Sequence, residues 1–331
     1  MPDLVVGGTE IAPGQIVDVD LAVARLPTRT RLTLPVRVVH GRRPGPRLWL
    51  SAAVHGDELN GIEIVRRVLE RLHPRTLNGA VLAAPIVNLH GFLHQTRDLP
   101  DGRDLNRSFP GSARGSLAAR LAHLFMEEVV SKCSHGIDLH TGSGQRTNLP
   151  QVRADLGDPQ TRGAAEAFGA PLLLHARLRD GSLREAATVR GVRTLLFEGG
   201  EAQRFDEDAI AVGVRGVRRV MGFLGMAEPP KGHATPSLVA DRSTWVRAPG
   251  SGMVRVLVRA GALVGKGDRL GVIANAFGES VATLKAPVDG MVIGVRLNPV
   301  VYQGDAVVHI AHQPRPVRVT SVARRASSPR R

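Results

Sequence analysis

Short apolar segments alternate with amphipathic segments of helical periodicity from residue 30 to about residue 225. This alternation is typical of an α/β layer fold, in which strands form a sheet and helices cover it. The predicted strands are Arg31–His40, Arg47–Val54, Ala80–Val87, Gly136–His140, Pro171–His175 and Arg193–Glu198. The predicted helices include Leu59–Leu72 and Leu117–Val130, each with one apolar face.

The pattern changes at the Pro- and Gly-rich stretch 228–236 (EPPKGHATP), beyond which helical periodicity stops. We therefore expect a first domain at 1–230 and a small all-β domain at 237–312. Within the second, Ala248–Val254 recurs as Ala286–Val292. Two similar halves indicate a small barrel or sandwich, and this segment resembles the biotinyl/lipoyl barrel family.

Barrels of that family present a modified lysine at a hairpin tip between their two halves. The corresponding position falls near Gly278-Glu279, whereas the nearby Lys285 lies beside the Ala-Pro turn. We therefore expect no carrier lysine and a structural or substrate-capping role for this domain. The segment 313–331 is rich in arginine and contains no acid, and we expect it to be a disordered basic tail.

Composition and charge are those of a globular protein. Of the 331 residues 43% are hydrophobic and 22% charged, and no apolar run approaches the roughly 18 residues that span a bilayer. The N-terminus lacks a basic start followed by an apolar stretch, so we expect a cytoplasmic protein with no membrane partner. The net charge of +14 lies partly in the tail and aromatic residues make up only 3%, which disfavours a nucleic-acid partner.

Histidines and carboxylates are the candidate metal ligands, because the single cysteine, Cys133, cannot build a thiolate site. His55 and Glu58 lie where an apolar strand leads into a helix, at the strand edge where open sheets bind ligands. His140 ends a second apolar strand, and three protein ligands with one open position suit a catalytic zinc. Asp138 lies on the same strand face and is either an orienting partner of a ligand or an ordinary buried polar residue.

Three separated motifs resemble the succinylglutamate desuccinylase/aspartoacylase family, relatives of the zinc carboxypeptidases, over about residues 30–225. The motifs are His55-Gly-Asp-Glu58, Asp104-Leu-Asn-Arg107 with Phe109-Pro-Gly, and Asp138-Leu-His140 with Thr141-Gly. The resemblance implies a zinc-carboxypeptidase-like mixed sheet with flanking helices. It also implies one Zn²⁺ per chain, held by His55, Glu58 and His140.

The same resemblance implies roles for four further residues. Asn106 and Arg107 match the substrate-binding pair, in which the guanidinium binds a carboxylate. Arg97 matches the arginine that stabilises the oxyanion of the tetrahedral intermediate. Glu198, in Leu195-Leu-Phe-Glu198-Gly-Gly, matches the general base that takes a proton from water activated by zinc. A capping or ion-paired acid is the structural alternative for Glu198, and Glu201 is close enough to be confused with it.

The resulting interpretation is a zinc-dependent deacylase, a hydrolase that removes an acyl group from a small N-acyl amino acid or a related linear amide. Two alternatives stay open: a metallocarboxypeptidase acting on peptides, and a non-hydrolytic zinc-binding protein that binds a partner through its β-domain. A homo-oligomer also stays open. Tyr302 is the only tyrosine and a candidate for substrate contact, although a turn residue is the simpler interpretation.

Overall fold

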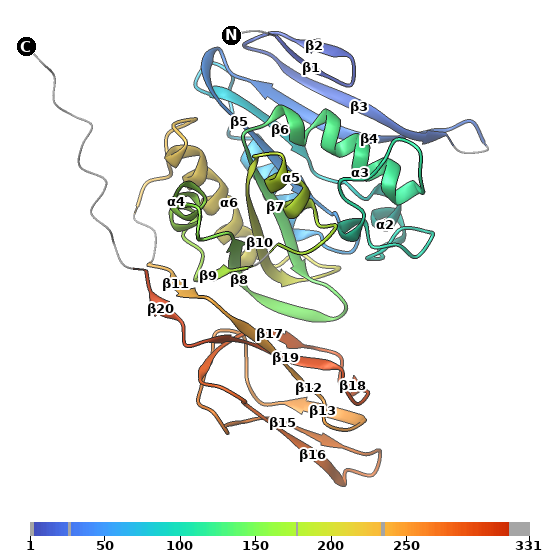
Figure 1. Ribbon diagram of the computed structural model, residues 1–331, viewed down its shortest axis with the longest axis vertical. Coiled ribbons are helices and arrows are strands. Elements are labelled where there is room, and N and C mark those ends of the chain that lie inside the picture. Colours follow the sequence, from blue (N-terminus) through green and yellow to red (C-terminus); the bar gives the residue numbers. More distant parts are fainter. Residues whose placement is uncertain (1–2, 26–27, 177, 233–235, 318–331) are drawn as a thin grey trace, which may run out of the picture.

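A large mixed sheet forms the centre of the molecule in the computed structural model, which describes residues 3–25, 28–176, 178–232 and 236–317 (Figure 1). Along the sheet the strands follow the order β12-β19-β17-β8-β10-β7-β5-β6-β4-β3. The strands of its N-terminal part are β3 (Ile16–Arg25), β4 (Arg31–His40), β5 (Arg43–Ala52), β6 (Asn78–Ala84), β7 (His135–Gly142), β8 (Arg146–Ala154), β9 (Leu172–His175) and β10 (Arg193–Glu201). The neighbours β6, β5, β7 and β10 run parallel, so their carboxyl ends meet at one edge.

Helices cover both faces of this sheet because alternate strand residues point to opposite sides. In β5, Leu48 and Leu50 join one core and Trp49 joins the other. The first core contains the apolar faces of α1 (Asn60–Leu69), α4 (Pro159–Phe168) and α6 (Glu207–Phe223). The second contains those of α3 (Leu117–Glu128) and α5 (Leu183–Val189), and Phe125 of α3 packs edge-on against Trp49 at 6.0 Å.

The predicted fold class is confirmed: the protein is α/β, with a mixed sheet, flanking helices and an antiparallel β part at the C-terminal end. Each predicted strand and both named helices are present with ends shifted by a few residues. The predictions omitted β3 and β8, although both are long strands. No helix among the described residues combines the length and the hydrophobicity needed to cross a bilayer.

The C-terminal part consists of short strands around a separate apolar core. A four-stranded sheet in the order β16-β15-β13-β18 packs against β12, β17 and β19, and Leu270, Ile273, Val292 and Ile310 are among the residues of that core. Its strands are β11 (Leu238–Ala240), β12 (Ser243–Arg247), β13 (Gly252–Val256), β14 (Leu263–Val264), β15 (Arg269–Ala274), β16 (Ser280–Lys285), β17 (Gly290–Arg296), β18 (Val300–Val301), β19 (Ala306–His312) and β20 (Arg315–Pro316). The likeness to biotinyl/lipoyl barrels, and the domain limits 1–230 and 237–312, stay predictions.

The main sheet runs without a break from the N-terminal part into the C-terminal part. Residues 294–296 of β17 pair antiparallel with residues 146–148 of β8, and β11 pairs in parallel with β9. The Pro- and Gly-rich stretch therefore marks a change of periodicity, while backbone hydrogen bonds still join the two parts. Within that stretch, residues 233–235 lie outside the described part of the chain.

The expectation that order ends at Gln313 is wrong for the next few residues. Arg315 and Pro316 form β20, which pairs with Val239 and Leu238 of β11. An ion pair of 2.7 Å between Arg315 and Asp241 adds to this pairing. The basic composition of this segment gave no indication of a strand, because the acid that pairs with its arginine comes from elsewhere in the chain. The remainder of the predicted tail, 318–331, lies outside the described residues.

Candidate active site

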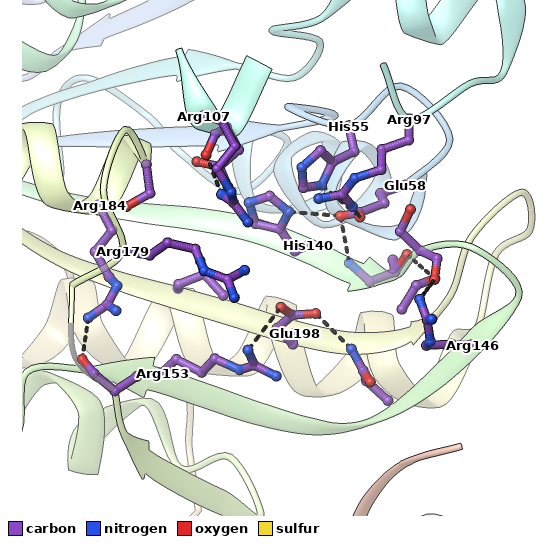
Figure 2. A pocket seen from close by; sticks show the side chains of 18 of the residues that line it. His55, Glu58, Arg97, Arg107, His140, Arg146, Arg153, Arg179, Arg184 and Glu198 are labelled. Atoms are coloured by element: carbon purple, nitrogen blue, oxygen red, sulfur yellow. Dashed lines mark hydrogen bonds and ion pairs between the residues drawn. The ribbon is translucent and has the colours of Figure 1, made fainter. Parts of the chain in front are cut away.

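A cavity of about 400 Å³ opens at the carboxyl ends of the parallel strands. Side chains from both parts of the chain line it, and Figure 2 shows most of them. The charged and aromatic lining residues are His55, Glu58, Arg97, Arg107, His140, Arg146, Arg153, Arg179, Arg184, Glu198 and Trp245. Every metal, catalytic and substrate-binding residue predicted from the sequence therefore lines a single cavity.

Three buried side chains form a compact cluster at its floor. His55 follows β5, Glu58 lies in the turn before α1, and His140 lies in β7. The Nδ1 atoms of His55 and His140 each lie 2.8 Å from a different oxygen of the Glu58 carboxylate. One ligand atom from each residue lies within 4.8 Å of the others, so the cluster could hold a metal ion.

Gly56 is required where this loop packs against the segment after β6. A Cβ atom at Gly56 would lie 1.9 Å from the carbonyl carbon of Gly91, closer than any side chain permits. The close approach brings the backbone between His55 and Glu58 against α2 (Leu89–His94). A glycine between the two predicted ligands thus has a packing reason of its own.

Two aspartates hold the opposite nitrogens of the histidine rings. Asp138 Oδ2 lies 2.8 Å from His140 Nε2, and Ser51 donates a hydrogen bond of 2.6 Å to the other Asp138 oxygen. Asp104 Oδ1 lies 3.3 Å from His55 Nε2. Carboxylates behind ligand histidines fix the ring orientation and the tautomer. The orienting interpretation of Asp138 thus agrees with the geometry, while the matching role of Asp104 was not foreseen.

Opposite charges dominate the electrostatics of the cluster. Burial lowers the pKa of His140, but the charges of Asp138 and Glu58 outweigh burial, so its pKa lies well above the usual value. The pKa of His55 is likewise raised, because Glu58 and Asp104 overcome the effect of burial. Burial raises the pKa of Glu58, yet the two histidines hold it below its usual range. The carboxylate is therefore ionised and poised for a positive partner.

Arg97 lies beside the cluster. Its guanidinium is 3.6 Å from Glu58 and 2.9 Å from Asp104, so it borders the position that a metal ion would take. Asn106 and Arg107 lie on the short 3₁₀ turn Leu105–Arg107. The Asn106 side-chain oxygen accepts a hydrogen bond of 2.9 Å from the backbone N–H of Leu183. This oxygen therefore binds the backbone rather than facing the cavity.

Glu198 lies on β10, across the cavity from the histidines (Figure 2). It accepts a hydrogen bond of 2.7 Å from Asn148 Nδ2, and Arg153 lies 3.9 Å away. Glu201, the residue with which it could be confused, forms an ion pair of 2.8 Å with Arg204 and does not line the cavity. Of these two acids, only Glu198 lines the cavity.

Several lining residues were not identified from the sequence. Arg146, Asn148 and Arg153 lie on β8, whose mixed sequence RTNLPQVRA shows no clear alternation of polar and apolar residues. Trp245 comes from β12 in the C-terminal part. The position of Trp245 at the cavity could not be predicted from the local sequence pattern, because it depends on how two distant segments of the chain pack together. Tyr302 is 70% exposed and is not among the lining residues, in agreement with the turn interpretation.

Behind Trp245 lies a buried histidine that gives a prediction about stability and pH. The rings of Trp245 and His309 stack at 4.4 Å, and burial lowers the pKa of His309 to about 3, with the charges of Arg153 and His312 adding to the effect. Between that value and the usual 6.5, the unfolded chain takes up a proton that the folded chain does not, so acidification destabilises the fold.

We expect this group to remove about 2–3 kcal/mol of the free energy of unfolding between pH 6.5 and pH 4.5. His309→Phe keeps a ring against Trp245 but cannot titrate, so its urea unfolding should lose correspondingly less stability over that interval than the wild type does. Equal losses in the two proteins would contradict a neutral His309.

A cavity that combines a candidate metal cluster, an opposed carboxylate and several guanidinium groups suits metal-assisted hydrolysis of an anionic substrate. Residues 44–224 match the sequence profile described as the Succinylglutamate desuccinylase/Aspartoacylase catalytic domain. The chain belongs to the succinylglutamate desuccinylase/aspartoacylase family, which confirms the resemblance predicted from its motifs, and it is an amide-bond hydrolase.

Relatives match nearly the full length of the chain. The N-alpha-acetyl-L-2,4-diaminobutyric acid deacetylase of Halomonas elongata is 29% identical over 295 residues, which cover 84% of this chain and 85% of the relative. The succinylglutamate desuccinylase/aspartoacylase structure from Rhodobacter sphaeroides has a TM-score of 0.81 at 28% identity, covering 90% of this chain and 94% of that one. A product-bound ectoine utilization protein from Ruegeria pomeroyi shares the fold, with a TM-score of 0.83 at 22% identity and coverage of 91% and 97%.

Proposed function

We propose that this protein removes the acyl group from a small N-acyl amino acid, with a zinc ion held by His55, Glu58 and His140. The observation that carries the proposal is the buried His/Glu/His cluster facing Glu198 across a small cavity lined with arginines. Family membership and the deacetylase relative support the reaction class.

The donor set fits zinc. Two imidazole nitrogens and one carboxylate converge within 4.8 Å, all three side chains are buried, and aspartates hold the far sides of both rings. A zinc ion with these ligands would supply Lewis acidity, which polarises a carbonyl oxygen and makes water easier to deprotonate. The chain's own residues would supply the remaining functions.

Glu198 would move the proton. Its carboxylate is held by Asn148 and lies across the cavity from the cluster, so it could accept a proton from the attacking water. The same group could then give that proton to the nitrogen of the leaving amine as the C–N bond breaks. The products would be a free carboxylate and a free amine.

Two arginines would bind the negative charges of the substrate. Arg97 borders the cluster through Glu58 and Asp104, and from there it could donate hydrogen bonds to the oxyanion that develops on the acyl carbonyl. Arg107 faces the cavity and forms no ion pair with any carboxylate in the described part of the chain, so it is available to a substrate carboxylate.

The size of the cavity supports a small substrate. A volume of about 400 Å³ suits a molecule of a few tens of atoms at most, and Trp245 from the C-terminal part forms one of its walls. Such a wall would give the β part the substrate-capping role predicted from the sequence.

The test is release of free amine by zinc-loaded protein from N-acetyl, N-succinyl and N-formyl amino acids, alongside short peptides with free C-termini. We expect turnover of acyl amino acids and little release of C-terminal residues from peptides. Turnover of peptides alone would favour a metallocarboxypeptidase. Silence across the whole panel, with zinc bound, would overturn the proposal in favour of a non-hydrolytic protein.

Arg107 gives a prediction about substrate binding. Arg107→Gln removes a charge-assisted contact to the substrate carboxylate, so we expect KM to rise by about 10- to 100-fold with a smaller change in kcat. Steady-state kinetics on the best substrate of the panel would measure both constants. Arg103→Gln is the matched control, because Arg103 is exposed and does not line the cavity. A KM that is equal in the two variants would contradict the assignment.

A further inference from the structure

A second basic cavity lies at the end of the sheet opposite to the candidate active site. Its volume is about 660 Å³, and its walls come from the start of β5, the segment between α1 and β6, and the end of α6. The histidine cluster follows the carboxyl end of β5, whereas this cavity adjoins the amino end of the same strand. A strand of ten residues separates the two, a length on the order of 30 Å.

The charges that line this second cavity are nearly all positive. They belong to Arg43, Arg71, Arg75, Arg218 and Glu228. Within the described part of the chain, none of the four guanidinium groups forms a hydrogen bond or an ion pair. Three of the arginines are exposed and Arg218 is half-buried, so their donors face water. A cleft lined by charges of one sign concentrates ions of the opposite sign.

The neighbouring arginines of α1, in contrast, are paired. Arg66 forms ion pairs with Glu63 and Glu70. Arg67 forms ion pairs with Glu63 and Glu207. The acids along this helix are therefore engaged by the arginines of the helix itself, and they leave none for the arginines of the cavity.

The helix ends at this cavity do not account for the arginines. Both α1 and α6 end there, and the carboxyl end of a helix carries about half a negative charge. The carbonyl groups at these ends accept backbone N–H groups, as Val68 does from Arg71 and Met221 does from Met226. Four guanidinium charges, set against Glu228 and two helix ends, still leave a net charge of about +2.

Backbone hydrogen bonds fix the walls of the second cavity. The Asn78 side chain, at the start of β6, donates a hydrogen bond of 2.8 Å to the carbonyl of Gly225, which follows α6. In the segment between α1 and β6, the N–H groups of Thr76 and Leu77 both bond to the carbonyl of His73. The arginines thus extend from a backbone that is held in place, so little of it has to be ordered when a ligand binds.

We propose that this second cavity binds a small anion with several linked phosphoryl groups, either inorganic triphosphate or the triphosphate of a nucleotide. Planar guanidinium groups bind phosphate oxygens two at a time. A triphosphate presents several negative charges along a short chain, which matches a group of arginines better than a single carboxylate does. The inference does not depend on the deacylase proposal.

The remaining lining supports a small ligand rather than a polymer. Leu72, Met221 and Pro229 give the cavity an apolar wall, against which the organic part of a nucleotide would pack. The volume lies in the range of about 300–1,000 Å³ that is typical of small-molecule sites. A nucleic acid strand would need an open basic surface with exposed aromatic rings, and no aromatic residue lines this cavity.

The test is calorimetric titration of zinc-loaded protein with inorganic triphosphate and with inorganic phosphate. We expect a Kd for triphosphate at least about 10-fold below that for phosphate, and an increase of about 10- to 100-fold in the double variant Arg71→Gln/Arg218→Gln. Arg75→Gln alone should raise it by about 3- to 10-fold. Because these side chains have no partners, both variants should unfold at the urea midpoint of the wild type. A Kd for triphosphate no lower than that for phosphate would overturn the proposal.

The double variant Arg255→Gln/Arg259→Gln is the matched control for charge. Both arginines are exposed on the C-terminal part and lie outside both cavities, and their replacement also removes two charges. This variant should keep the wild-type Kd for triphosphate. A loss of affinity as large as that of Arg71→Gln/Arg218→Gln would reduce the binding to attraction by net charge and would overturn the site.

Two further variants separate this cavity from the active site, where zinc and arginines could also attract phosphoryl groups. His55→Ala lacks one proposed metal ligand and Arg107→Gln one lining charge, and neither residue lies at the second cavity. Both variants should bind triphosphate as the wild type does. Affinity lost in either of them, and retained in Arg71→Gln/Arg218→Gln, would place the anion at the active site and overturn the proposal.

Comparison of ligands identifies the source of the phosphoryl groups. If ATP binds at least about 3-fold more tightly than triphosphate, the apolar wall contacts the nucleoside and the ligand is a nucleotide. Equal affinities would show that the triphosphate group alone is recognised. Either result supports the site, provided that Arg71→Gln/Arg218→Gln weakens the binding. Tighter binding of a single-stranded oligonucleotide than of either small anion would overturn the proposal in favour of a nucleic-acid surface.

Discussion

Replacing Glu198 by glutamine is expected to lower kcat by about 100- to 10,000-fold while zinc remains bound. The amide has nearly the same shape as the carboxylate, and its oxygen can still accept the hydrogen bond of Asn148, which is 2.7 Å long in the wild type. What the variant loses is the ability to take a proton from water and return it to the leaving amine. The measurements are kcat on the best acyl amino acid and the zinc content of the same preparation.

Glu201→Gln is the control for this experiment. Glu201 lies on the same strand and pairs with Arg204, outside the cavity, so its loss should change kcat by less than about 3-fold. If both variants retained wild-type turnover, another group would have to be the base. If only Glu201→Gln lost turnover, the two acids would have to exchange roles.

Replacing His55 by alanine is expected to remove the metal and to lower kcat/KM by at least about 1,000-fold. Only Glu58 and His140 would remain of the three convergent side chains, and the Asp104 carboxylate would lose the ring that it faces. We expect about one zinc per chain in the wild type and almost none in the variant. Added zinc should raise the melting temperature of the wild type and leave the melting temperature of the variant unchanged.

His94→Ala is the matched control for metal binding. His94 is exposed at the end of α2 and lies outside the cavity, so this variant should keep the zinc content, the thermal response and the turnover of the wild type. Full zinc content in His55→Ala, accompanied by wild-type turnover, would refute the ligand assignment. Zinc retained together with lost turnover would place His55 in substrate binding instead.

The cluster could be predicted because its residues occupy strand ends. His55 and His140 each follow an apolar run, and strands that run parallel bring such positions to one edge without further information. Asp138 could be proposed for the same reason, since it lies two residues from His140 on the same face. The role of Asp104 could not be predicted from the sequence, because its approach to His55 depends on the path of the loop after α2.

The arginines that β8 contributes to the cavity could not be predicted from the local sequence pattern. Arg146 and Arg153 belong to β8, whose sequence RTNLPQVRA mixes polar residues with a proline and so lacks clear alternation. The chain also contains so many arginines that no single one is conspicuous. Trp245 poses a different problem, because its partner Arg146 is distant in sequence and the two lie on β12 and β8, which the sheet order β12-β19-β17-β8 brings together.

That pairing of β8 with β17 has a consequence for how the chain can be divided. If the chain were cut near residue 236, backbone N–H and C=O groups at residues 146–148, and along β9, would face water as open strand edges. Exposed edges of this kind recruit strands from other molecules and lead to aggregation. The hydrolase part is therefore not a module that can be separated and recombined freely, and its solubility depends on the last quarter of the chain.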